Sequence, residues 1–216
     1  MLKIITIDGL ASSGKSTLSR LLAEKINWKW LSSGVLYRGL SYIANQENLK
    51  EEKDLVKLVQ SSCWRVELTR QKSLFFYNNT DITAQIYLQQ IDDLSSALSL
   101  CIPLRQELIP IQRDFYSSEE GLIIEGRDSG TVIFPKAPLK IFLKASAKMR
   151  AQRRAKDRKE KEEEILLAQT QRDQRDQNRP FAPVKIAKNS LILDSEKDPL
   201  EDMVHKVYQE YKKIFL

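Results

Sequence analysis

The chain has 216 residues, of which 42% are hydrophobic and 30% are charged, and its formal net charge is +6 at pH 7. A chain of this length forms one sizeable core, because domains typically span about 100–200 residues. No apolar stretch approaches the roughly 20 residues of a membrane span, so a membrane-spanning function is excluded. The basic excess is compatible with nucleic acid or with small polyanionic substrates.

The N-terminal segment predicts a strand, a glycine loop and a helix in direct succession. Residues 3–8 form an apolar run without polar alternation, which is typical of a buried parallel strand. Apolar residues then recur at helical spacing from Leu18 to Ile26. The apolar start leads directly into the loop and does not resemble a signal peptide, so we expect a cytoplasmic protein. The loop fits the phosphate-binding pattern and consists of Gly9, Leu10, Ala11, Ser12, Ser13, Gly14, Lys15, Ser16 and Thr17.

The chemistry of this loop indicates a nucleoside triphosphate, with ATP as the expected donor. Two glycines allow the backbone to wrap an anion, and amide N–H groups at the helix start point at a β-phosphate. Lys15 is expected to reach the β- and γ-phosphates, and Ser16 to ligate the accompanying Mg²⁺. The alternative, a glycine turn that merely joins a strand to a helix, is disfavoured because a chance match of this pattern is rare.

The next elements predict a doubly wound parallel sheet. A strand at 28–31 leads through Ser33 into a helix that carries Tyr37 and Arg38, and this strand-helix order favours parallel pairing with right-handed crossovers. Three further buried strands are predicted at 121–125, 140–144 and 191–194. Ligands of such sheets bind at the carboxyl ends of the strands, so the phosphate loop, Ser33 and Arg127-Asp128 should meet at one edge.

An insertion separates the second and third of these strands. Its predicted elements are a charged helix at 47–62, antiparallel strands at 64–68 and 74–77, a turn at 78–81 that can continue into a third short strand, and a helical region at 85–116. We expect Pro103 to break that helical region and Pro110 to kink it. Residues 60–83 are therefore interpreted as a small antiparallel insertion on the parallel core.

Residues 147–179 are among the most charged in the chain. The basic part at 150–161, followed by acidic residues, is interpreted as a solvated helix with i,i+4 ion pairs. Arg172, Asp176 and Arg179 instead share one helical face just before Pro180 ends the helix, which predicts a mobile arm that closes on phosphates.

The remaining segments carry no predicted chemistry. The C-terminal helix is expected to begin with Asp198 as its cap and Pro199 at its first position, and to pack an apolar stripe on the sheet. His205 is interpreted as a surface or hydrogen-bonded histidine. Cys63 and Cys101 lack a CxxC partner, which favours buried reduced thiols.

Several motifs together resemble the bacterial cytidylate kinase family of nucleoside monophosphate kinases. The similarity spans nearly the whole chain and lies in Ile7-Asp8-Gly9 with the phosphate loop, Ser33-Gly34-Val35-Leu36-Tyr37-Arg38, Gly126-Arg127-Asp128-Ser129-Gly130-Thr131-Val132 and the segment from Arg172 to Arg179. The resemblance implies an α/β P-loop kinase fold and ATP-dependent phosphorylation of CMP or dCMP.

The resemblance also implies the roles of individual residues. Ser33 would lie at the acceptor site, with the acceptor phosphate held by Arg38, Arg127 and Arg179. Ser96, Arg105 and Asp128 would recognise cytosine, and Arg172 and Asp176 would contact the pentose and its surroundings. Ser95 competes with Ser96 for its role, and Glu125 stands at a strand end where it could reach Mg²⁺ through water. The catalytic cations would be Lys15, Arg127, Arg172 and Arg179.

The same resemblance divides the single domain into three parts and implies a monomer. These parts are a core at about 1–33, 117–146 and 188–216, a monophosphate-binding region at about 34–116 and a lid at about 147–187. One alternative is another nucleotide or small-molecule kinase on the same core. A second is a nucleic-acid-binding protein, which is disfavoured because acidic residues follow the basic segment at once and no aromatic residues interleave with it.

Overall fold

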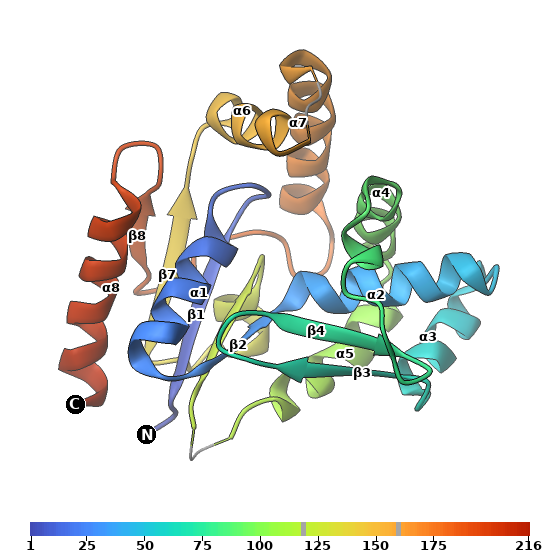
Figure 1. Cartoon of the computed structure of the whole chain (residues 1–216), viewed down its shortest axis with the longest axis horizontal. Coiled ribbons are helices and arrows are strands. Elements are labelled where there is room, and N and C mark those ends of the chain that lie inside the picture. Colours follow the sequence, from blue (N-terminus) through green and yellow to red (C-terminus); the bar gives the residue numbers. More distant parts are fainter. Residues whose placement is uncertain (118–119, 159–160) are drawn as a thin grey trace.

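The computed structural model describes residues 1–117, 120–158 and 161–216. Its centre is a five-stranded, all-parallel sheet with the strand order β2-β6-β1-β7-β8 (Figure 1). The strands are β1 (Ile4–Gly9), β2 (Lys29–Ser32), β6 (Leu122–Gly126), β7 (Leu139–Lys144) and β8 (Leu191–Asp194). The doubly wound parallel sheet predicted from the sequence is therefore confirmed, with each strand within two residues of its expected position.

The central strands carry apolar side chains on both faces, because other elements of the fold cover both faces of the sheet. In β1, Ile5 and Ile7 face one cluster while Ile4 belongs to another, as the alternation of side chains along a strand requires. Helices α1 (Lys15–Ile26) and α8 (Leu200–Phe215) pack on the first face. The apolar stripe predicted for the C-terminal helix is thus confirmed, and Met203, Val207 and Tyr211 are buried in it.

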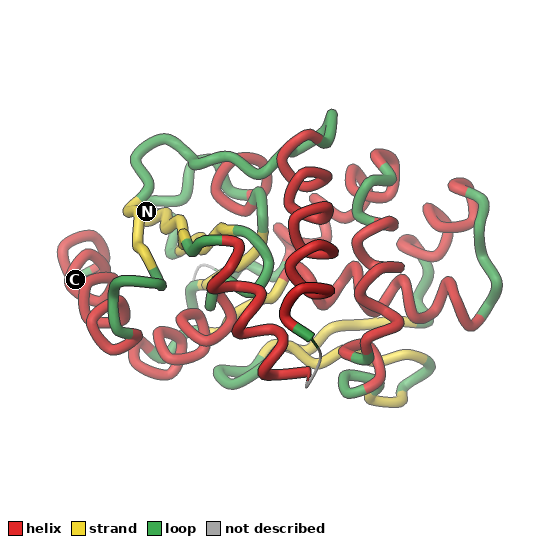
Figure 2. The backbone as a smooth tube through the Cα atoms, turned by 90° about the horizontal axis from the view of Figure 1, so that it is seen from above, coloured by secondary structure: helices red, strands yellow, loops and turns green. Residues whose placement is uncertain are grey.

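A second layer of structure lies away from the termini, which are close together on the opposite side in both views (Figures 1 and 2). It contains α2 (Ser33–Gln46), α3 (Glu52–Gln60), the antiparallel strands β3 (Trp64–Leu68), β4 (Ser73–Tyr77) and β5 (Thr80–Asp81), the short helix η1 (Gln85–Tyr87), α4 (Gln89–Leu98) and α5 (Ile102–Asp114). Its core surrounds Phe75, whose ring lies directly over Gly39 of α2. The antiparallel insertion is therefore confirmed.

Several local predictions are wrong. Helix α3 begins at Glu52 rather than at 47. The helical region at 85–116 is broken as predicted, but the break lies at 99–101, between α4 and α5, and Pro103 stands in the first turn of α5. Proline is tolerated there because the first helical N–H groups have no intrahelical acceptor. Asp198 does not cap α8. Its carboxylate pairs with Lys206 (Oδ1 to Nζ, 3.1 Å), and Pro199 precedes the helix without a side-chain hydrogen bond.

Helices α6 (Ala147–Arg158) and α7 (Glu162–Asn178) form an arm at the carboxyl end of the sheet (Figure 1). Among the described residues, no helix combines the length and apolar character needed to cross a membrane. The two cysteines are free, as expected, but each is only half-buried.

Candidate active site

The phosphate loop follows β1 and ends at α1, as the sequence predicts. Gly9 and Gly14 have φ values of +154° and +93°, which L side chains rarely adopt. A Cβ added to Gly9 would also lie 2.5 Å from the carbonyl oxygen of Leu143 on β7. The loop therefore requires glycine at both of its ends for steric reasons.

Lys15 and Ser16 begin α1 with their side chains on the cavity side of the loop. Lys15 is 7% exposed and donates from Nζ to the Leu10 carbonyl oxygen at 2.7 Å. Burial, followed by the nearby charge of Arg127, lowers the pKa of Lys15 to about 7. An anion beside this ammonium would favour its charged form. Ser16 donates from Oγ to Oε1 of Glu125 at 2.7 Å, so the hydroxyl and a carboxylate at the end of β6 lie together.

Asp8, for which no role was predicted, lies at the carboxyl end of β1 and shapes the turn that follows the neighbouring strand β6. Its buried carboxylate accepts backbone N–H groups from Ser129 at 2.9 Å and Gly130 at 2.7 Å. Burial raises the pKa of Asp8 to about 6, while these two hydrogen bonds oppose the shift. The bonds fix a turn of π-helix at Ser129–Ile133 that the sequence did not predict. The sequence carried one signal of this role, because Asp8 is a charged residue at the end of an otherwise apolar strand.

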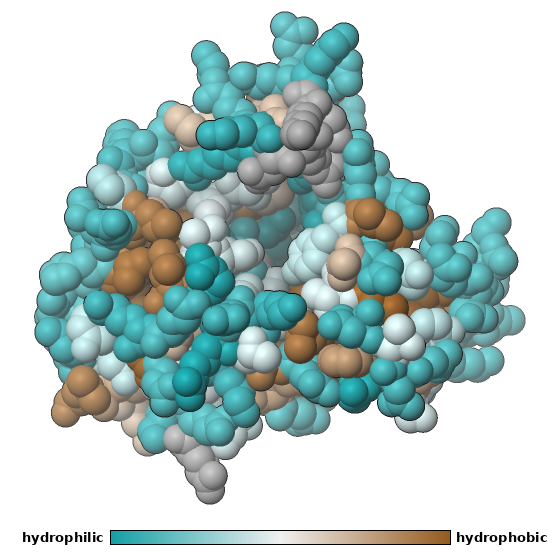
Figure 3. Space-filling view, viewed as in Figure 1, coloured by the Kyte–Doolittle hydropathy of each residue, from teal (hydrophilic) through white to brown (hydrophobic). Residues whose placement is uncertain are grey.

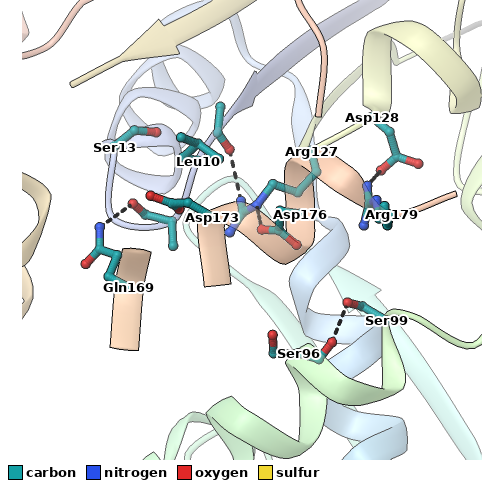
Figure 4. A network of polar contacts seen from close by, with 12 residues as sticks. Leu10, Ser13, Ser96, Ser99, Arg127, Asp128, Gln169, Asp173, Asp176 and Arg179 are labelled. Carbon is teal, nitrogen blue, oxygen red and sulfur yellow. Dashed lines mark hydrogen bonds and ion pairs between the residues drawn. The ribbon is translucent and has the colours of Figure 1, made fainter. Parts of the chain in front are cut away.

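The turn after β6 presents Arg127 and Asp128 to the cavity in different directions. Arg127 donates from Nη1 to the Gly9 carbonyl oxygen (3.0 Å) and from Nε to Asp176 Oδ2 (2.8 Å), so it lies between the phosphate loop and α7 (Figure 4). Asp128 instead pairs with Arg105 (Nη2 to Oδ2, 2.5 Å) and with Arg179 (Nη2 to Oδ1, 3.4 Å).

Arg105 and Asp128 form one buried polar end of the cavity with Tyr37. The Arg105 guanidinium lies 5.4 Å from the centroid of the Tyr37 ring, and burial raises the pKa of Tyr37 to about 12. A fixed carboxylate, a fixed arginine and an aromatic ring suit a planar, polar heterocycle.

Arg172 lines the cavity without a hydrogen bond at its buried Nε in the described part of the chain. Burial and the neighbouring Arg127 lower the pKa of Arg172 to about 9. A buried cation of this kind is stabilised by an anionic ligand, because burial penalises a charge that has no counter-charge.

The arm is attached to the phosphate loop by its own charged residues. Arg150 forms two hydrogen bonds with Asp173 (3.2 and 2.6 Å) and donates to the Ala11 carbonyl oxygen (3.2 Å). Gln169 of α7 also donates to Ala11 (3.3 Å; Figure 4). Arg153 donates to Ser195 beyond β8. The interpretation of this basic segment as a solvated helix is therefore wrong for Arg150 and Arg153, and also for Arg154, which lines the cavity. Lys159 and Glu160 lie outside the described residues.

Another buried carboxylate, Asp92 of α4, joins two arginines that line the cavity. It pairs with Arg38 through Oδ1 and with Arg154 of α6 through Oδ2, the latter at 2.7 Å. The sequence suggested a phosphate role for Arg38 only. Asp92 and Arg154 were missed, since an acid in one helix and a base in another carry no signal of mutual contact.

The phosphate loop, the turn after β6 and side chains of α2, α5 and the arm line a hollow beneath the arm (Figure 3). Its lining includes seven cationic side chains and three carboxylates, so it suits a polyanionic ligand. Predicted site residues that line it are Ala11, Ser12, Lys15, Ser16, Ser33, Arg38, Arg105, Arg127, Asp128, Arg172, Asp176 and Arg179. Of the described residues, Gly9, Leu10, Ser13, Gly14, Thr17 and Ser96 are predicted site residues outside the lining. Ser95 and Ser99 line the cavity near Ser96, whose carbonyl oxygen accepts from Ser99 (Figure 4).

Comparison with known proteins places the chain in a family. The cytidylate kinase family model matches residues 5–213. The chain belongs to the cytidylate kinase family. A cytidylate kinase from Bdellovibrio bacteriovorus is 36% identical over 211 residues, which cover 97% of each chain. One from Photorhabdus laumondii is 38% identical over 218 residues, covering 98% of this chain and 96% of the relative.

Solved structures support the fold. A sugar kinase from Janibacter sp. superposes with a TM-score of 0.50 at 14% sequence identity, covering 100% of this chain and 96% of the other. At this identity the likeness concerns the fold alone. Residues of the phosphate loop and the Arg105–Asp128 pair line the same cavity.

Proposed function

We propose that the protein transfers the γ-phosphoryl group of ATP to an α-phosphate oxygen of CMP or dCMP, giving CDP or dCDP and ADP. The observation that carries the proposal is the buried Arg105–Asp128 pair, which shares one cavity with the phosphate loop in a chain of the cytidylate kinase family.

The Arg105–Asp128 pair fits cytosine better than uracil. Cytosine presents an N4 amine that donates to a carboxylate, whereas uracil presents a carbonyl oxygen there. Arg105 can donate to O2 and N3 of cytosine, but uracil carries a proton at N3. A buried polar group left without a partner costs about 1–3 kcal/mol, which is enough for marked discrimination. We place the base at this end, with Tyr37 beside it and Ser95, Ser96 or Ser99 within its surroundings.

The transfer itself requires positioning and charge neutralisation rather than a general base. The second pKa of a phosphomonoester is about 6, so the acceptor phosphate is already a nucleophilic dianion at neutral pH. The only histidine, His205, lies on the exposed face of α8 and hydrogen-bonds to Gln209. We assign charge stabilisation to Lys15, Arg127, Arg172 and Arg179. We assign binding of the acceptor phosphate to Arg38, helped by Arg127 and Arg179, with Ser33 at the acceptor site.

The residues around Ser16 fit the Mg²⁺ that accompanies ATP. Ser16 Oγ and Glu125 Oε1 are 2.7 Å apart, and Oε2 of Glu125 is buried without a hydrogen-bond partner in the described part of the chain. Mg²⁺ prefers oxygen ligands and retains several waters, so one hydroxyl, the nucleotide phosphates and a carboxylate beyond the waters suffice. When bound, the ion neutralises charge on the transferring phosphoryl group.

The division of the domain follows the same assignment. We propose that residues 34–116 bind the monophosphate, that the arm at about 147–187 is a lid, and that the rest is the core. A closed lid excludes water, which otherwise competes as the acceptor. We further propose that the enzyme acts as a cytoplasmic monomer and does not require nucleic acid.

An acceptor panel tests the proposal. ADP release from Mg-ATP is measured with CMP, dCMP, UMP, AMP and gluconate at equal concentrations. We expect the two cytidine nucleotides to give the highest kcat/KM. A flat response to both would contradict the proposal, and a preference for AMP, UMP or gluconate would favour another small-molecule kinase on the same core. Steep salt-dependent binding of DNA or RNA, without kinase activity, would instead support a nucleic-acid-binding function.

A further inference from the structure

Asp92 is a buried carboxylate that lies beside the cavity without belonging to its lining. It is 2% exposed on α4 and contacts two arginines from distant parts of the chain. Arg38 comes from α2, 54 residues away, and Arg154 comes from α6 in the arm, 62 residues away. Both arginines line the cavity. The carboxylate therefore joins the proposed monophosphate region to the arm at the edge of the site.

The surroundings of Arg38 hold its guanidinium in one orientation. Its Nη2 contacts Asp92, its Nη1 donates to the Ile86 carbonyl oxygen at 3.2 Å, and its guanidinium lies 5.0 Å from the centroid of the Tyr87 ring. A planar guanidinium with five N–H donors can make these contacts and still present donors to a phosphate. Because its orientation is set beforehand, less conformational entropy is lost when an anion binds.

The charges of Asp92, Arg38 and Arg154 explain why the contact between Asp92 and Arg154 matters. Without Asp92, two guanidinium groups would face each other across the edge of the cavity and repel. With it, one carboxylate bridges the two cations and offsets their mutual repulsion. The arm can move away from α4 only if the Arg154–Asp92 pair is broken.

We propose that Asp92 is a positioning residue that couples acceptor binding to closure of the arm. It orients Arg38 toward the acceptor phosphate and, through Arg154, keeps the arm over the same phosphate. The inference rests on the proposed function, in which Arg38 binds the phosphate of CMP. A purely structural ion-pair cluster would affect the stability of the fold but not the affinity for the acceptor.

The test compares Asp92→Asn with Asp93→Asn. Asp93 is the next residue on α4 and is exposed, so it is a matched control for the loss of one acidic charge. Initial rates are measured with CMP varied at saturating Mg-ATP, and then with Mg-ATP varied. We expect Asp92→Asn to raise the KM for CMP about tenfold or more, in line with loss of a charged hydrogen-bond partner. The KM for ATP should change less than twofold, and Asp93→Asn should match the wild type.

Two further variants separate coupling from folding defects. Arg154→Met should raise the KM for CMP in the same direction, and the double variant should be no worse than the more impaired single variant, because both changes break the same link. Asp92→Glu, which keeps the charge, should recover part of the loss. If Asp92→Asn fails to fold, Asp92→Glu decides the question, because a raised KM for CMP with an unchanged KM for ATP would support the coupling and an unchanged KM for CMP would refute it.

The outcomes are distinguishable. A wild-type enzyme that releases no ADP with CMP would overturn the proposed function, and this inference with it. A wild-type enzyme that is active with CMP, while Asp92→Asn shifts only the melting temperature and leaves the KM for CMP unchanged, would overturn this inference alone. Additive effects of Asp92→Asn and Arg154→Met would refute the coupling between them.

Discussion

Replacing Asp128 by Asn should destabilise the protein far more than removing an acid from the surface. The substitution keeps the shape of the side chain but removes the negative charge that Arg105 and Arg179 share. The side chains of Arg105 and Asp128 are only 4% and 10% exposed, so solvent cannot replace the lost partner. The buried Arg105 guanidinium would remain charged without a counter-charge.

The expected magnitude follows from burial. Breaking a buried ion pair by removing one partner costs about 3–5 kcal/mol. For a chain of this size, 1 kcal/mol corresponds to about 2–4 °C in melting temperature, so we expect a decrease of about 6–20 °C. A matched surface pair, Arg65–Glu67, has the same chemistry but side chains that are 46% and 51% exposed. Glu67→Gln should cost at most about 1 kcal/mol.

The assay is thermal and urea unfolding of the unliganded wild type, Asp128→Asn and Glu67→Gln at pH 7. The acceptor panel is then repeated at a temperature where all three are folded, and Asp128→Asn should lose its preference for CMP over UMP while Glu67→Gln keeps it. Equal changes of melting temperature in the two variants would refute the energetic reasoning. Retained cytosine preference in Asp128→Asn would refute the assignment of the base end.

Three other predictions follow from the structure. Lys15→Met should lower turnover by about a hundredfold or more, because the ammonium stabilises charge in the transition state. It should cost less stability than Asp128→Asn, because burial already penalises the charged ammonium. An unchanged kcat would contradict the role of Lys15. Burial raises the pKa of Asp8 from 3.8 to about 6, so between these pH values the folded chain binds a proton that the unfolded chain has released. The free energy of unfolding therefore falls by about 3 kcal/mol as the pH rises through this window. Asp8→Asn should abolish that slope in urea unfolding at pH 4–6, and an unchanged slope would contradict the assignment. Gly39→Ala places a Cβ 2.1 Å from the Phe75 ring, so it should cost about 1–3 kcal/mol in thermal unfolding, whereas a neutral effect would show that the ring moves aside.

Sequence patterns predicted the elements well wherever a local rule governed them. Buried strands carry continuous apolar runs, and the antiparallel insertion carries alternating or clustered apolar residues between turn signals, so both were placed correctly. The π-helical turn was missed because its cause, the Asp8 carboxylate, lies 121 residues away in the chain from Ser129. The cap at Asp198 was mispredicted because its carboxylate pairs with Lys206 instead.

The sequence by itself determined the phosphate loop, the parallel sheet and the edge at which the motifs meet, since glycine sterics, apolar periodicity and strand direction are local properties. Only the tertiary structure decided which charges neutralise one another. Nothing in the spacing of Asp92, Arg38 and Arg154 indicates that one carboxylate serves both arginines, and Arg150 gave no sign of its pairing with Asp173. Ion pairs between distant segments depend on how helices pack on the sheet, and that packing is set by the whole core.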